Sequence, residues 1–149
     1  MQAGDLHAAA DLHKARFSHA WNDGAFHSLL NQETVFGFVA KQTSLQWGVS
    51  TLGGFVLSRA AAGEAEILTV GVDLRFERQG LGWRLMRAAM GEARHRGVES
   101  MFLEVDETNG GAVGLYQKLG FFKVGERNAY YKSGDGRRST ALVMKLDLR

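Results

Sequence analysis

A strand–helix–strand succession in the middle of the chain constrains the fold more than any other feature of this sequence. Residues 65–73, AEILTVGVD, are dense in β-branched and apolar residues and predict a buried strand. Residues 78–96 have apolar residues at helical spacing, and residues 100–107, SMFLEVDE, predict the next strand. Two strands joined by one helix pair in parallel through a right-handed crossover. The chain is therefore expected to contain a parallel strand pair with a helix on its face.

The segments on either side of this unit predict two further helices and two strand hairpins. The first third of the chain is expected to be helical, and the residues that recur there at helical spacing are Leu6, Ala9, Ala10, His13 and Phe17. A second helix is expected over 23–30, strands over 34–40 and 53–60, and a short helix over 110–120 capped by Asn109. Strands over 121–131 and 139–148 are joined by a turn at 133–137. We expect one α+β domain over 1–149, a mixed sheet with helices on its faces.

Two glycines, Gly80 and Gly82, precede the central helix in the stretch RQGLGW. A helix usually starts at Ser, Thr, Asp or Asn, whereas glycine contributes no capping oxygen and instead exposes the backbone. Amide groups at the start of a helix attract anions, so a phosphate or pyrophosphate is the expected ligand. The segment is not a P-loop, and Leu85 stands where a dinucleotide fingerprint requires its third glycine. A tight strand-to-helix turn is the alternative interpretation.

Two side chains near this glycine turn are candidates for acid–base chemistry. Glu104 is expected on the same strand face as Phe102 and Asp106. A carboxylate among apolar neighbours binds a proton more readily than one in water, which suits a general base. Tyr116 carries a phenol that can donate a proton. The alternatives are a solvent-facing strand residue for Glu104 and a core aromatic for Tyr116.

Composition and charge exclude several classes of protein. The chain has no cysteine, which rules out disulfides and cysteine-based zinc sites, and its five histidines form no convincing ligand cluster, so we expect no metal. The net charge of +2 comes from dispersed basic residues, which gives no nucleic-acid footprint. No apolar run reaches the roughly 20 residues of a membrane span, and the first residues lack the pattern of a signal peptide. These features favour a cytoplasmic protein without a membrane partner.

The glycine turn and a second motif together resemble the GNAT N-acetyltransferases. RQGLGWRLM resembles the pyrophosphate-binding motif of that family, and NGGAVGLYQKLGF resembles its second coenzyme-A motif, in the expected order. LEVDETNGGAVGLYQKLGF, RNAYYKSGDGR and ALVMKLDL are similar to the RimI branch, which acetylates the N-terminal alanine of small-subunit ribosomal protein eighteen. The resemblance covers nearly the whole chain. It departs from the family at Glu77 and in residues 41–54, which we interpret as a longer hairpin.

The resemblance implies a GNAT fold whose parallel strands splay at the coenzyme site, and it assigns roles to individual residues. Glu104 would be the general base and Tyr116 the general acid. Acetyl-CoA would be the acetyl donor. The residues implied in binding it are Val70, Gly71 and Val72 along the pantetheine arm, the amides of Arg78, Gln79, Gly80, Leu81, Gly82 and Trp83 at the pyrophosphate, and Asn109. Because the cradle uses backbone amides, the Glu77 side chain is expected to face solvent.

The implied acceptor is the α-amine of a protein N-terminus, most simply the N-terminal alanine of a ribosomal protein. Tyr130, Tyr131 and Trp21 are candidates for the peptide groove, with packing roles as the alternative, which weighs at least as much for Trp21. Two alternatives are an acetyltransferase for a small-molecule amine and a coenzyme-binding module without catalysis. The first would need an acidic pocket for a polycation, and the second would need neither Glu104 nor Tyr116. We expect a monomer.

Overall fold

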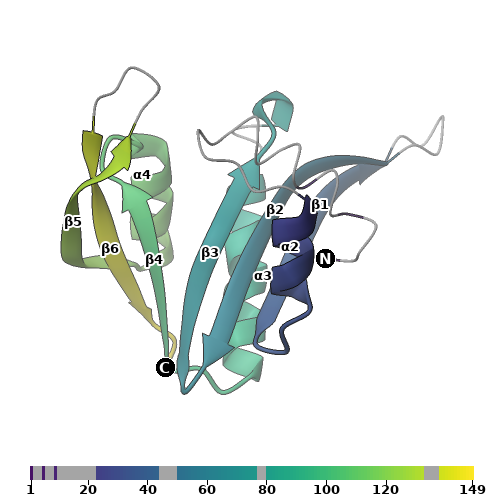
Figure 1. The fold of residues 1–149 in the computed structure, drawn as a ribbon, viewed down its shortest axis with the longest axis horizontal. Coiled ribbons are helices and arrows are strands. Elements are labelled where there is room, and N and C mark those ends of the chain that lie inside the picture. Colours follow the sequence, from purple (N-terminus) through teal and green to yellow (C-terminus); the bar gives the residue numbers. More distant parts are fainter. Residues whose placement is uncertain (2–4, 6–8, 10–22, 44–49, 77–79, 133–137) are drawn as a thin grey trace.

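Six strands form one mixed sheet in the order β1-β2-β3-β4-β6-β5 (Figure 1). The structure is a computed structural model, and it describes the 149-residue chain except residues 2–4, 6–8, 10–22, 44–49, 77–79 and 133–137. The strands are β1 (Val35–Thr43), β2 (Ser50–Ala61), β3 (Glu64–Val72), β4 (Ser100–Asp106), β5 (Phe122–Lys132) and β6 (Arg138–Asp147). The helices of the described part are α2 (Asp23–Leu30), α3 (Leu81–His95) and α4 (Gly110–Leu119), with a short 3-10 turn, η2 (Leu74–Phe76), after β3.

The larger core lies between the sheet and the two helices α3 and α4, which cover the same face (Figure 1). Side chains on one stripe of α3, such as Met86 and Ala93, belong to the same buried cluster as Met101 and Leu103 of β4 and Met144 of β6, and all five are almost inaccessible to solvent. Burial of apolar surface on this scale is the main source of stability in such a fold. The buried stripe predicted for this helix is confirmed.

A smaller core forms on the opposite face of the sheet. There Val35, Phe55 and Leu57 are buried, and Leu29 and Leu30 of α2 pack against them. Helices therefore flank the sheet on both sides, as the sequence predicted. The helix expected over Leu6 to Phe17 and the turn at 133–137 lie mostly or wholly outside the described residues.

The hairpin formed by β1 and β2 extends beyond the two strands that the sequence predicted over 34–40 and 53–60. Its pairing runs from Val35 opposite Arg59 to Thr43 opposite Ser50, with a register shift after Ala40. The interpretation of residues 41–54 as a longer hairpin is therefore confirmed where the chain is described. Trp47 lies outside the described residues.

The parallel strands β3 and β4 pair only at their beginnings. The register pairs run from Glu64 opposite Ser100 to Glu66 opposite Phe102, and beyond them the strands diverge (Figure 1). β3 continues to Val72 with β2 alone as its strand partner. One edge of the second half of β3 thus faces the gap between the diverging strands, and its backbone groups on that edge are available to another molecule.

A β-bulge accompanies this divergence. Leu57 of β2 lies opposite Thr69 of β3, while the next residue, Ser58, lies opposite Ile67, so Leu68 has no partner of its own. A bulge bends its strand and increases its twist. This extra residue gives a local reason for β3 to turn away from β4. The hydroxyl oxygens of Ser58 and Thr69 beside it are buried without a hydrogen-bond partner.

Candidate active site

The start of α3 presents unpaired amides, as the two glycines predicted. Gly80 is the N-cap residue, in the left-handed conformation at φ 79°, and no side chain caps the helix. The first intrahelical bond is donated by the amide of Arg84 to the carbonyl of Gly80, at 3.0 Å. The amides of Leu81, Gly82 and Trp83 therefore have no acceptor within the helix. Arg78 and Gln79, where the helix was expected to begin, lie outside the described residues, as does Glu77.

The two glycines of this turn serve different physical needs. A side chain at Gly80 would meet nothing within 4 Å, so its positive φ is the reason for glycine there. A Cβ at Gly82 would lie 3.1 Å from Leu115 Cδ2 of α4 and 4.0 Å from Val72 Cγ2 of β3. Gly82 therefore lies where the start of α3, the end of β3 and α4 come together.

The second half of β3 supplies the free edge that an extended ligand could use. Val70, Gly71 and Val72 pair with β2 on one side and have no strand partner toward β4. Val70 and Val72 pack on the larger core, and a Cβ at Gly71 would lie 2.9 Å from Phe55 Cε1. This segment is rigidly held on one edge and open on the other, which is the arrangement that lets a ligand add as a further strand.

Glu104 lies on the face of β4 turned away from α3. Side chains along β4 alternate, with Met101, Leu103 and Val105 buried in the larger core on the face covered by α3 and α4, and Glu104 on the other face. Its side chain is 24% exposed, and Arg127 Nε of β5 lies 3.0 Å from its Oε1. The neighbours expected from the sequence on this face were Phe102 and Asp106, and Arg127 is an additional one, because β6 brings the arginine of β5 close to β4. No local pattern predicts this contact, since it depends on the order of the strands in the sheet.

Tyr116 belongs to α4 on the other face of the sheet. It is 6% exposed, and its ring packs edge-to-face on Phe121, with ring centroids 5.9 Å apart. Glu104 and Tyr116 thus come from opposite faces. One molecule can contact both side chains only if it passes through the sheet. Such a passage is possible where β3 and β4 diverge, because their backbones are not paired there.

The loop between β4 and α4 is fixed by two polar side chains. Asn109 caps α4, its Oδ1 accepting a hydrogen bond from the amide of Ala112 at 3.2 Å, as the sequence predicted. Asp106 Oδ1 accepts from the amide and hydroxyl of Thr108 at 2.9 and 2.8 Å, and its Oδ2 accepts from Ser139 Oγ at 2.7 Å. The bonds of Asp106 tie the end of β4, where Glu104 lies, to β6 and to the loop that leads into α4.

Burial acts to raise the pKa of Asp106, but the hydrogen bonds from Ser139 and Thr108 outweigh it and hold this pKa below its ordinary value of 3.8. A depressed pKa stabilises the fold above the ordinary value, and that stabilisation is lost as the pH falls through the folded-state pKa. We therefore expect Asp106→Asn to lower the free energy of unfolding at neutral pH by about 1 kcal/mol. Urea denaturation should show this difference shrinking below pH 3.8. Asp147→Asn, at an exposed carboxylate, is the control, and a pH-independent difference for Asp106→Asn would contradict the assignment.

Of the three residues expected at a peptide groove, the structure describes the backbone of Tyr130 and Tyr131 but not Trp21. Tyr130 and Tyr131 lie on β5, and Tyr131 is in register with Ser139 of β6. Their side chains and the whole of Trp21 lie outside the described residues. Both tyrosines therefore belong to the same strand as Arg127.

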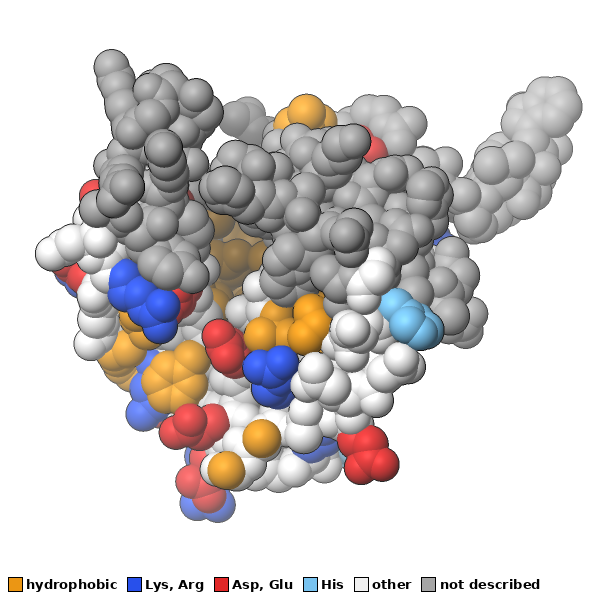
Figure 2. Space-filling model, in the orientation of Figure 1, with side chains coloured by type: hydrophobic (Ala, Val, Ile, Leu, Met, Phe, Trp, Pro, Cys, Tyr) orange, Lys and Arg blue, Asp and Glu red, His pale blue; other side chains and the backbone are white. Residues whose placement is uncertain are grey.

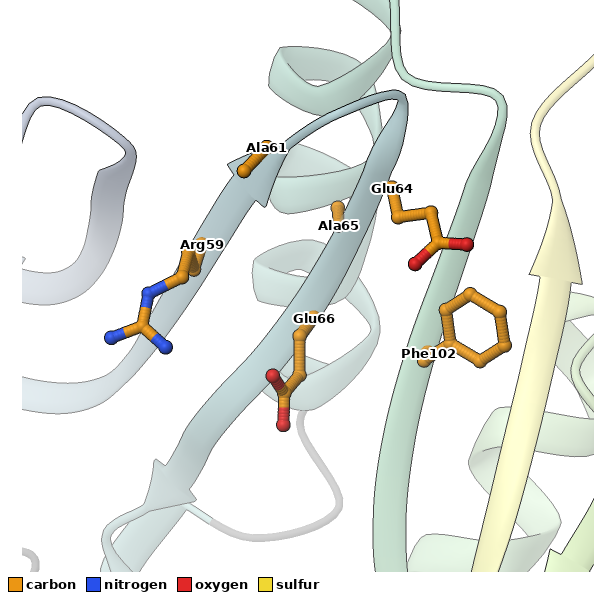
Figure 3. A pocket seen from close by; sticks show the side chains of 6 residues that line it. All are labelled: Arg59, Ala61, Glu64, Ala65, Glu66 and Phe102. Atoms are coloured by element: carbon orange, nitrogen blue, oxygen red, sulfur yellow. The ribbon is translucent and has the colours of Figure 1, made fainter.

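A depression of about 290 Å³ lies at the paired end of β3 and β4, away from the residues expected at the site (Figure 3). Its lining comprises Arg59, Ala61, Glu64, Ala65, Glu66 and Phe102. Glu64 points toward the ring of Phe102, and the charged groups at its rim are of both signs (Figure 3). Viewed from the same face, Figure 2 shows a separate recess between the β1–β3 half and the β4–β6 half, with hydrophobic side chains inside it.

Two negative observations apply to the described part of the chain. No three of its His, Asp and Glu side chains are grouped as they would be to hold a metal ion. No helix within it is long and apolar enough to cross a membrane.

Comparison with known proteins gives consistent matches. The profile of the acetyltransferase (GNAT) family matches residues 6–121. The [ribosomal protein bS18]-alanine N-acetyltransferase of Escherichia coli K12 is 31% identical over 99% of this chain and 95% of its own. The N-alpha-acetyltransferase RimI of Mycobacterium tuberculosis is 40% identical over 57% of this chain and 49% of its own.

The fold agrees with these matches. The crystal structure of the ribosomal-protein-S18-alanine N-acetyltransferase from Escherichia coli superimposes with a TM-score of 0.88 at 30% identity, covering 99% of this chain and 90% of that one. The mixed sheet with its diverging parallel pair, the uncapped start of α3 and the family profile lead to one conclusion. The chain belongs to the GNAT family of acetyltransferases.

Proposed function

We propose that this protein transfers an acetyl group from acetyl-CoA to the α-amine of a protein N-terminus. The observation that carries the proposal is the loss of pairing between β3 and β4 beside Glu104, with Tyr116 on the opposite face of the sheet. A thioester entering from the α3 side and an amine entering from the Glu104 side would meet at this opening. Relatives along the whole chain are named for the N-terminal alanine of ribosomal protein bS18, and we propose the same class of acceptor here.

Acetyl-CoA fits the residues present in two places. The unpaired amides of Leu81, Gly82 and Trp83 suit the pyrophosphate, because they combine free donors with the positive end of the helix dipole. The open edge at Val70 and Val72 suits the amides of the pantetheine arm. Arg78, Gln79 and Asn109 remain proposed contacts.

The reaction then needs one base and one acid. An α-amine has a pKa of roughly 8 and is mostly protonated at neutral pH. Glu104, directly or through one water, takes a proton from it, and the nitrogen forms a bond to the acetyl carbonyl carbon. Backbone amides at the end of β3 stabilise the oxyanion that forms. Tyr116 then gives its proton to the sulfur as the carbon–sulfur bond breaks, and its phenolate takes up, directly or through water, the second proton that the nitrogen loses on becoming the amide. Holding both reactants in one opening lowers the entropic cost.

The proposed function also implies a cellular location, an oligomeric state and a peptide groove for this protein. A ribosomal acceptor places the reaction in the cytoplasm, and residues 1–149 would act as one monomeric N-acetyltransferase domain. Tyr130, Tyr131 and Trp21 are proposed to shape the groove for the first residues of the acceptor peptide.

Incubation with acetyl-CoA and a set of short peptides tests this function. The set contains peptides that begin with alanine, serine, methionine or N-acetylalanine, each with one internal lysine, and a polyamine is included. Mass spectrometry should place the acetyl group on the free α-amine, with alanine preferred, and N-acetylalanine peptides should remain unmodified. Modification of lysine side chains or of the polyamine alone would contradict an α-amine acceptor. Absence of any transfer would contradict the proposed activity.

A further inference from the structure

The contact between Arg127 and Glu104 joins two strands that are not neighbours in the sheet. Glu104 of β4 is in register with Val143 of β6, and Val143 is in register with Gly125 of β5. Since Gly125 has no side chain, the position of β5 directly beyond Val143 is open. Arg127 uses this space and places its Nε 3.0 Å from Glu104 Oε1.

The small residue between the strands also permits this contact. Arg127 is in register with Ala141 of β6, which lies opposite Asp106 of β4. A methyl group at position 141 leaves room for a guanidinium to cross β6. Two small residues, Gly125 and Ala141, therefore lie beside the path from Arg127 to the candidate base.

The neighbouring charged groups of β4 and β6 on this face, Asp106 and Lys145, are engaged elsewhere. Asp106 binds Thr108 and Ser139, and Lys145 lies over the ring of Phe102 at 5.9 Å and 3.5 Å from a carboxylate oxygen of Asp147. Among the described residues, Arg127 is the cation that contacts Glu104.

Stability does not account for this ion pair. The Arg127 side chain is 57% exposed, and an ion pair of that exposure contributes about 0–1 kcal/mol to folding because water and salt screen it. A peptide lying on this face would exclude water from the pair and strengthen it. The ion pair between Arg127 and Glu104 is therefore expected to be stronger when a peptide substrate is bound than in the free protein.

We propose that Arg127 is a positioning residue that holds the Glu104 carboxylate for proton abstraction. By binding Oε1 it fixes the carboxylate and leaves Oε2 directed to the acceptor amine or its bridging water. This role rests on the proposed function of Glu104 as the base. It adds to that function a residue that acts through the base rather than on the substrate.

Steady-state kinetics with an alanine peptide provide the test. Arg127→Gln should lower kcat by about 10-fold or more, because a base displaced from its productive geometry loses much of its effect. The KM for acetyl-CoA and the melting temperature should stay at the parent values, because the pair is exposed and the coenzyme lies on the other side of the sheet. Arg127→Lys, which keeps the charge, should restore part of kcat. Lys123→Gln on the same strand, which removes a charge paired with Glu126, is the matched control and should leave kcat unchanged.

A double-mutant cycle separates an effect through Glu104 from a general effect of charge. If Arg127 acts only by holding Glu104, Arg127→Gln should have no further effect in a Glu104→Gln background. Equal kcat for the parent and Arg127→Gln, or multiplying effects in the double variant, would overturn the role of Arg127 and leave the proposed function intact. A parent protein that does not acetylate the peptide would overturn both.

Discussion

Replacement of Glu104 by glutamine is expected to lower kcat for peptide acetylation by roughly 10²–10⁴-fold, the range for loss of a general base. The amide keeps the size of the side chain but cannot accept the proton of the incoming ammonium. Glu104 lies on the face away from α3, so the amides at the start of α3 are unaffected. Acetyl-CoA binding, measured by calorimetry, should therefore be close to that of the parent.

Glu66→Gln is the matched control for this result. Glu66 is an exposed carboxylate of β3 at the paired end of the parallel strands, where it lines the separate depression. Its replacement should leave both kcat and acetyl-CoA binding unchanged. Equal activity of Glu104→Gln and the parent would remove Glu104 from the mechanism, whereas equal losses in both variants would indicate a general effect of negative charge.

Replacement of Gly82 by valine should weaken acetyl-CoA binding by about 10- to 100-fold, which corresponds to the loss of one or two charge-assisted hydrogen bonds. A branched side chain there would cover the amides of the first turn of α3. It would also press on Leu115, because even a Cβ at this position lies 3.1 Å from Leu115 Cδ2. Both effects act at the junction of β3, α3 and α4.

Two further variants separate these effects. Gly91→Val places the same change in α3 where nothing lies within 4 Å of the added Cβ, so coenzyme binding should be unchanged. Leu115→Ala combined with Gly82→Val removes the steric contact with α4 but keeps the amides covered. If this double variant binds acetyl-CoA as tightly as Leu115→Ala alone, the start of α3 is not the pyrophosphate site.

Much of the fold could be predicted from local patterns. The spacing of apolar residues gave the buried face of α3, and the order of strand, helix and strand gave the parallel pair of β3 and β4. Asn109 was predictable as a cap because a short polar side chain preceded the helix, and its bond to Ala112 confirms it. The predicted start of α3 at Arg78 was too early, because helical periodicity does not reveal that Gly80 takes a left-handed conformation.

The surroundings of the candidate base could not be predicted, because they depend on contacts between distant segments. The last hairpin was expected, but its orientation was not, and it is β6 rather than β5 that lies beside β4. That order brings Arg127 to Glu104 across Ala141. No local sequence pattern around either residue predicts that the two side chains are in contact. The early end of the pairing between β3 and β4 was implied by family resemblance alone.

A crystal structure with coenzyme A bound is the measurement that tests the site most directly. We expect the diphosphate on the amides of Leu81, Gly82 and Trp83, and the sulfur between the diverging strands. The sulfur should lie within hydrogen-bonding distance of the Tyr116 hydroxyl, with the Glu104 carboxylate reachable from it through an amine or one water. Coenzyme A bound elsewhere, for example in the depression beside Phe102, or a sulfur remote from both side chains, would contradict the proposed site.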